Sequence, residues 1–231
     1  MQLVDRALRF SRANPVVFAP LLVHWVIQCA FGVAASRLSG TAAGVWLETA
    51  VGLTWLAFPL FLAATEALII RGLELGRANY RHLVGRTLAL SWRAVLPLVF
   101  LLTLAGSAWR MSALAGGAFF FGTALLFSFF PEALFHEKSL QQALERSLGL
   151  LEDHPLECLA ATGTVVAFGL ATSALGLWHL EGAADFDLHM PGMTSLLMVP
   201  AIVAAVAIMV FRDMLYERVR LTHAVGINAN W

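Results

Sequence analysis

Residues 15–36 read PVVFAPLLVHWVIQCAFGVAAS, an apolar run without a single charged side chain. An α-helix rises about 1.5 Å per residue, so a run of about 20 residues can cross the hydrocarbon core of a bilayer. A cleavable signal has a shorter apolar region of about 7 to 15 residues, so we expect this run to be retained. The stretch predicts a membrane-spanning helix near the N-terminus.

Five further apolar runs follow, at residues 45–70, 95–114, 118–135, 156–178 and 193–211. The chain of 231 residues is 59% hydrophobic and only 13% charged, which is more apolar than a soluble domain of this length can bury. Between the third and fourth runs we expect a turn at Ala115, Gly116 and Gly117, where the backbone is most flexible. The sequence predicts an all-α fold: a polytopic membrane helical bundle of six spans, forming one integral membrane domain over residues 1–231.

The placement of basic residues predicts the orientation of these spans. If the N-terminus is cytoplasmic, all but two of the 15 lysine and arginine residues lie on the cytoplasmic side, the exceptions being Arg37 and Arg110. This asymmetry follows the positive-inside rule, and six spans return the C-terminus to the same side. The net charge is zero, so we expect no nucleic-acid partner.

The segments that precede the odd-numbered spans resemble one another. Each has an Arg-x-Leu triplet followed by a proline, at Arg6-Ala7-Leu8 with Pro15, Arg86-Thr87-Leu88 with Pro97, and Arg146-Ser147-Leu148 with Pro155. Each segment is amphipathic at the helical period, as in helices that lie on a membrane surface. The even-numbered spans contain Pro59, Pro131 and Pro200. We therefore predict three interfacial helices and a threefold repeat of surface helix plus hairpin, with units 1–70, 76–135 and 138–211 and a cytoplasmic tail 212–231. Irregular spacing of the leading prolines leaves coincidence open as the alternative.

Two short stretches carry a resemblance to a known family. Residues 129–135 (FFPEALF), followed by Lys138-Ser139-Leu140 and Arg146-Ser147, form one, and residues 209–216 (MVFRDMLY) form the other. The chain resembles the uncharacterised YciC-type family of bacterial inner-membrane proteins and, more distantly, the membrane domain of some glycerophosphodiester phosphodiesterases. The resemblance implies a multi-pass protein of the bacterial inner membrane. It implies no catalytic residues, because the phosphodiesterase's soluble catalytic domain has no counterpart here.

Polar side chains at membrane depth are costly and are therefore the first candidates for a functional site. His24 and Gln28 lie one turn apart near the middle of the first span. They could bind a cofactor, relay a proton or contact a substrate, but we favour hydrogen bonds to neighbouring helices. Glu66 and Glu132 lie near the cytoplasmic ends of their spans, where we expect ion pairs with Arg71, Arg77 or Lys138.

The outer loop between the fifth and sixth spans groups imidazole and carboxylate side chains, which are competent ligands for a divalent metal: His179, Glu181, Asp185, Asp187 and His189. Their spacing matches no known metal-binding motif, and exposed loops are polar in any case. We predict no cofactor and keep a divalent metal at this loop as the alternative.

The sequence lacks a Gly-rich phosphate loop, an HExxH motif and a GxSxG motif. We therefore favour a non-enzymatic scaffold or accessory subunit that acts through membrane lipids, a membrane-protein partner or a second copy of the chain. A transporter of small solutes or lipids is the first alternative, because repeats and proline-interrupted spans recur in transporters. A cofactor- or metal-dependent membrane enzyme is the second.

Overall fold

The structure is a computed structural model that describes residues 2–79, 113–137, 139–174 and 193–225. Within these ranges every regular element is helical, which confirms the all-α prediction. The elements are α1 (Gln2–Ala13), the 3-10 helix η1 (Pro15–Phe18), α2 (Ala19–Arg37), α3 (Ala42–Leu75), α5 (Ala113–Leu126), α6 (Phe130–His136), α7 (Leu140–Asp153), α8 (Pro155–Ala174) and α10 (Met193–Val225).

Two helical segments in the described residues are long and apolar enough to cross a bilayer. They are Pro15–Arg37, which comprises η1 and α2, and Met198–Leu221 within α10. The segment Pro155–Phe168 of α8 is apolar but shorter. The first agrees with the predicted span at 15–36, and the second begins within the predicted span at 193–211 and continues beyond it.

Several predicted boundaries are wrong. Helix α5 runs through Ala115, Gly116 and Gly117 without a turn, because a helix tolerates glycine at a modest cost. The turn comes later, since α5 ends at Leu126 and α6 begins at Phe130. Pro131 occupies the first turn of α6, where its missing N–H costs nothing. The predicted span 118–135 is thus divided between two helices, and residues 80–112 lie outside the described part of the chain.

The last helix is also longer than predicted. Residues 212–225, predicted as a tail, continue α10 as helix. Likewise α3 extends past residue 70 to Leu75 and ends at Gly76, whose φ of 72° places it in the left-handed conformation typical of a helix C-terminus. Residues such as Arg212 and Asp213 are therefore held on a rigid helix that packs against the rest of the molecule.

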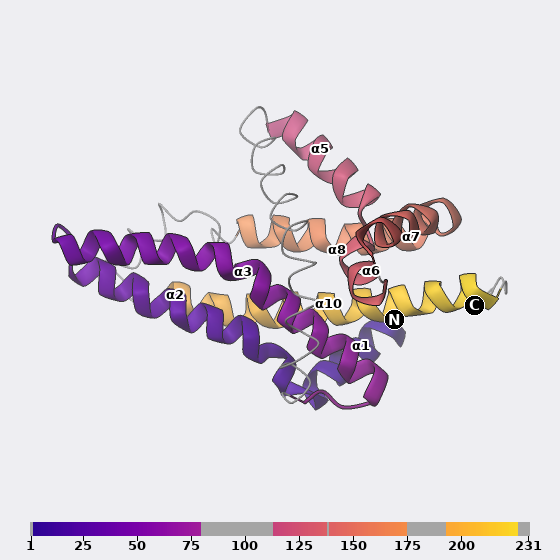
Figure 1. Cartoon of the computed structure of the whole chain (residues 1–231), viewed down its shortest axis with the longest axis horizontal. Coiled ribbons are helices and arrows are strands. Elements are labelled where there is room, and N and C mark those ends of the chain that lie inside the picture. The colour runs from indigo at the N-terminus through magenta and orange to yellow at the C-terminus, as the bar shows by residue number, and fades with distance from the viewer. Residues whose placement is uncertain (1, 80–112, 138, 175–192, 226–231) are drawn as a thin grey trace.

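Figure 1 shows how the helices are arranged. Helices α2 and α3 form a long antiparallel hairpin that points toward one end of the molecule, while α8 and α10 run along its longest axis. Helices α1, α6 and α7 gather in the opposite half, where both ends of the chain also lie. Helix α1 packs against α10, and α7 packs against α6 and α8. The amphipathic helices therefore share one half of the molecule.

Helices α1 and α7 end in the same way. Asn14 (φ −126°, ψ 66°) precedes Pro15, and His154 (φ −134°, ψ 57°) precedes Pro155. The proline ring disfavours the helical conformation in the residue before it, and at both positions that residue leaves the helix. The two amphipathic segments predicted at these places are thus helices that stop where the following apolar helix begins.

The Asn14 side chain also joins α1 to the end of α3. Its Oδ1 accepts a hydrogen bond of 2.8 Å from the buried N–H of Ala78, and its Nδ2 donates to the carbonyl oxygen of Phe10. We expect Asn14→Ala to lower the free energy of unfolding by about 1–3 kcal/mol, because the buried Ala78 N–H loses its acceptor. Asn14→Asp keeps that acceptor and should lose less. Equal losses in the two variants, measured by unfolding in bicelles, would contradict this role.

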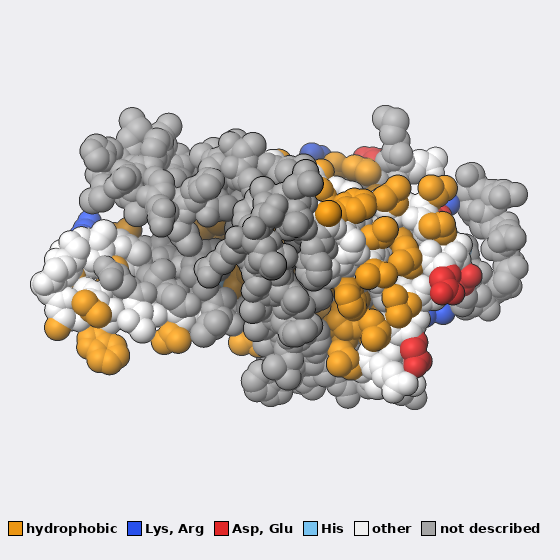
Figure 2. Space-filling model, turned by 90° about the horizontal axis from the view of Figure 1, so that it is seen from above, with side chains coloured by type: hydrophobic (Ala, Val, Ile, Leu, Met, Phe, Trp, Pro, Cys, Tyr) orange, Lys and Arg blue, Asp and Glu red, His pale blue; other side chains and the backbone are white. Residues whose placement is uncertain are grey.

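The core consists of two clusters of buried side chains. One lies among α1, η1, α2, α3 and α10, and the other among α6, α7, α8 and α10. Outside them, large hydrophobic side chains remain exposed, including Trp46 at 75% and Leu156 at 76%. Figure 2 shows hydrophobic side chains grouped over one part of the surface with acidic and basic groups at its margin. Such a surface suits contact with lipid or with another protein.

Candidate functional site

His24 and Gln28 of α2 both face α3. The buried His24 ring lies between Phe58 and Phe61, with ring centroids 5.2 and 5.0 Å away. Gln28 donates a hydrogen bond from Nε2 to Thr54 Oγ1. Both contacts are with the neighbouring helix of the hairpin, through a hydrogen bond for Gln28 and through ring packing for His24.

Glu66 and Glu132 do not form the separate surface pairs that we expected. Arg71 instead pairs with Glu74, its Nη1 lying 2.6 Å from Glu74 Oε2. Glu66 and Glu132 are 6% and 2% exposed, and they belong to one buried cluster with Arg212 and Asp213 of α10. We call these four residues the acidic cluster.

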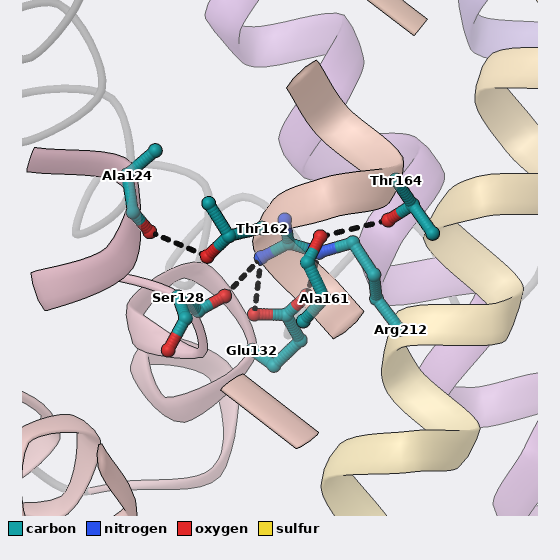
Figure 3. A network of polar contacts seen from close by, with 7 residues as sticks. All are labelled: Ala124, Ser128, Glu132, Ala161, Thr162, Thr164 and Arg212. Atoms are coloured by element: carbon teal, nitrogen blue, oxygen red, sulfur yellow. Dashed lines mark hydrogen bonds and ion pairs between the residues drawn. The ribbon is translucent and has the colours of Figure 1, made fainter. Parts of the chain in front are cut away.

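Arg212 is the only base of the acidic cluster. Its Nε lies 2.6 Å from Glu132 Oε1 and its Nη2 3.1 Å from Glu132 Oε2, a two-pronged ion pair (Figure 3). The same Nη2 also donates to the carbonyl oxygen of Ser128, in the turn between α5 and α6. Since Arg212 is a residue of α10, one side chain joins α10 to that turn and to α6. The planar guanidinium suits this arrangement because it presents several donors at fixed angles.

A neighbouring hydrogen bond strengthens the junction. Thr162 of α8 donates from Oγ1 to the carbonyl oxygen of Ala124, at 3.1 Å and close to the end of α5 (Figure 3). The last carbonyl groups of a helix have no partner within the helix. Thr162 and Arg212 therefore attach the end of α5 and the turn after it to α8 and α10.

The other half of the acidic cluster is a pair of carboxyl groups. The carboxyl groups of Glu66 and Asp213 are neighbours in this buried cluster, and Asp213 is 1% exposed. Among the described residues, no nitrogen or hydroxyl donor reaches either oxygen of Asp213. Two ionised carboxylates have only acceptors, so two neighbouring buried carboxyl groups can hydrogen-bond to each other only if they share a proton. The pair is therefore a candidate proton-binding site beside the ion pair of Arg212 and Glu132.

The three acids of the cluster share a short local sequence pattern. Each is followed two positions later by a buried leucine, at Glu66-Ala67-Leu68, Glu132-Ala133-Leu134 and Asp213-Met214-Leu215. They lie on α3, α6 and α10, helices far apart in the chain. Sequence reasoning missed Asp213 and the partnership of Arg212, and the acid-x-Leu pattern could not have identified them, because Glu157-Cys158-Leu159 has it too and lies outside the cluster.

A second cluster of polar side chains lies near the ends of α6 and α10. The His136 ring stacks on Tyr216, with centroids 5.2 Å apart, and its Nε2 lies 3.3 Å from Glu217 Oε1. Glu217 also pairs with Arg220 at 3.0 Å. Burial lowers the pKa of His136, an effect that Arg220 increases and that Glu217, Glu74 and Glu137 oppose. The imidazole is therefore held mainly in its neutral form.

This environment predicts a pH dependence of stability. The unfolded chain binds a proton at His136 near the ordinary value of about 6.5, whereas the folded chain resists it. The contribution of His136 should be fully present above about pH 6.5 and should be lost as the pH falls from there toward the lower pKa of the folded state. His136→Phe should flatten this part of the curve of unfolding free energy against pH. An unchanged slope would exclude the effect.

The described residues contain no group of three or more His, Cys, Asp or Glu side chains that could hold a metal ion. The predicted metal-binding residues lie outside the described ranges: His179, Glu181, Asp185, Asp187 and His189. What the acidic cluster can do is bind a proton and hold three helices together. Comparisons with protein-family models, with curated proteins and with solved structures found no match to this chain.

Proposed function

We propose that this chain is a multi-pass protein of a bacterial inner membrane, with both termini in the cytoplasm, and that it acts as a non-enzymatic scaffold or accessory subunit. In this proposal its partners are membrane lipids and another membrane protein or a second copy of itself. The resemblance to YciC-type proteins belongs to the same proposal. The surface of α1 and α7, rather than an internal cavity, would be the working part of the molecule.

One observation carries the proposal: the polar side chains expected at membrane depth all face protein neighbours. His24 packs against two phenylalanines, Gln28 bonds to Thr54, and Glu66 and Glu132 belong to the acidic cluster. A transport site or a catalytic site needs such groups to meet a ligand. Hydrophobic side chains of the amphipathic helices, in contrast, are left exposed, among them Val4 and Leu8 of α1 and Leu140 and Leu148 of α7.

We further propose the six spans and the threefold unit of surface helix plus hairpin. In support, the same order of helices occurs twice among the described residues. The amphipathic helix α1 is followed by the apolar helices α2 (with η1 before it) and α3, and the amphipathic helix α7 is followed by the apolar helices α8 and α10. The matching backbone at Asn14 and His154 is consistent with this unit. Reporter fusions in the loops would test the topology. A fusion after Arg37 should report the outside, and a fusion after Gly76 should report the cytoplasm.

Photocrosslinking in native membranes tests the scaffold role. A photoreactive residue at Leu148, which is 38% exposed on α7, should crosslink to a defined partner protein, to lipid or to a second copy. The same residue at Leu150, which is 1% exposed on the same helix, is the matched control and should crosslink only within the chain. If surface positions yield no intermolecular product and the protein purifies as a lipid-free monomer, the proposal fails.

A transporter is the second candidate, because the neighbouring buried carboxyl groups of Glu66 and Asp213 could take part in proton coupling. In that case proteoliposomes should show solute-dependent proton uptake, and Asp213→Asn should abolish it. If Asp213→Asn leaves this proton uptake unchanged, the transporter candidate is excluded.

The metal alternative is tested by elemental analysis of the purified full chain, with His179→Ala and His189→Ala as variants.

A further inference from the structure

An apolar groove runs between α1, α8 and α10. Val4, Ala7 and Leu8 of α1 form one wall, and Ala207, Ile208 and Phe211 of α10 form another. Thr164 of α8 completes the lining, and its hydroxyl is already bonded to the carbonyl oxygen of Ala161. The groove has a volume of about 180 Å³. Val4 and Leu8 are 52% and 41% exposed, so the groove is open to its surroundings.

The groove extends from the expected cytoplasmic surface into the expected membrane interior. Phe211 is directly followed by Arg212 of the acidic cluster, and Ala207 lies about one turn deeper on α10. Thr164 lies nine residues after Pro155, about 13 Å along α8. The groove therefore reaches a depth at which only the acyl chain of a phospholipid lies. An apolar lining without free polar groups fits such a chain.

The helix beside the groove is positively charged. Helix α1 contains three arginines and one acid, and its Asp5 is paired with Arg9. Arg6 and Arg12 are exposed, and Arg12 lies one turn after Leu8 of the groove wall. Helix α7 offers an internal comparison, because Leu8 aligns with Leu148 and Pro15 with Pro155. Helix α7 has the opposite charge balance, because it contains one arginine and three acidic residues. Of these two described helices, α1 is the one whose charge is complementary to an anionic headgroup.

We propose that this groove binds one acyl chain of an anionic phospholipid whose phosphate lies against the arginines of α1. The inference rests on the proposed membrane location and names the lipid partner of the α1 surface. A basic residue close to a membrane surface contributes about 1 kcal/mol to the binding of anionic lipid. That free energy corresponds to a factor of about five in relative affinity.

Native mass spectrometry of the purified full chain tests the proposal, with phosphatidylglycerol and phosphatidylethanolamine of identical acyl chains supplied in equal amounts. The wild type should retain phosphatidylglycerol preferentially. The double variant Arg6→Gln and Arg12→Gln should lower that preference at least about fivefold. Arg37→Gln, an equally exposed arginine at the far end of α2, is the matched control and should leave it unchanged.

A second pair of variants tests the groove itself. Ala207→Trp fills it and should remove the retained lipid, whereas Ala43→Trp, at an exposed position near the start of α3 and away from the groove, should not. Equal retention of the two lipids by the wild type, or retention by Ala207→Trp as strong as by the wild type, would overturn the proposal. The scaffold role is judged separately, because crosslinking at Leu148 on α7 does not depend on this groove.

Discussion

Arg212→Met is expected to lower the free energy of unfolding by about 3–5 kcal/mol. The substitution leaves the Glu132 carboxylate, which is 2% exposed, without its counterion, and it removes the donor to the Ser128 carbonyl oxygen. A buried charge without a partner is far more costly than the intact pair is stabilising. Helix α10 should then separate most easily from α6 and from the turn after α5. Steric trapping in bicelles measures this free energy directly.

Two further variants separate the ion pair from the loss of side-chain volume. Arg71→Met makes the same change in an exposed pair, with Glu74, and should cost no more than about 1 kcal/mol. Adding Glu132→Gln to Arg212→Met removes the unpaired charge and should restore more than half of the loss. If the double variant is as unstable as Arg212→Met alone, the unpaired carboxylate is not the cause.

Phe129→Ala is expected to cost about 3–5 kcal/mol. Phe129 is 0% exposed, lies in the turn between α5 and α6, and packs against Tyr216 with ring centroids 5.8 Å apart. Removing its ring leaves a cavity between α6 and α10 beside the Ser128 carbonyl oxygen to which Arg212 donates. In close-packed protein the neighbours relax only partly into such a space, so most of the lost contacts are not regained.

Phe121→Ala is the matched control, because it removes the same ring from α5 at a position that is 40% exposed. It should change the free energy of unfolding by well under half as much. Thermal unfolding in detergent followed by circular dichroism is sufficient to rank the two variants. Equal effects would show that the turn after α5 is not the packing centre that the contacts indicate.

The sequence was most informative where the physical cause is local. Pro15 and Pro155 follow the ends of the amphipathic helices α1 and α7, because a proline disfavours helix in the residue before it. The apolar run at 15–36 is helical because its length and composition suit no other membrane-compatible backbone. The predicted position of the turn between the third and fourth spans was wrong, because two local signals, a pair of glycines and a proline, competed there. Gly116 and Gly117 were taken for a turn, but they are tolerated inside α5, and the turn falls just before Pro131.

The sequence by itself determined that this protein is helical, that it has apolar segments able to cross a bilayer, and where its amphipathic helices end. Each of these follows from neighbouring residues along one helix. Only the tertiary structure decided that Glu66, Glu132 and Asp213 meet around Arg212, and that α1 borders a groove with α8 and α10. Both features depend on how helices that are distant in the chain pack together. This packing determines which side chain becomes the partner of each buried charge, and the hydropathy of the sequence carries no information about which helices pack together.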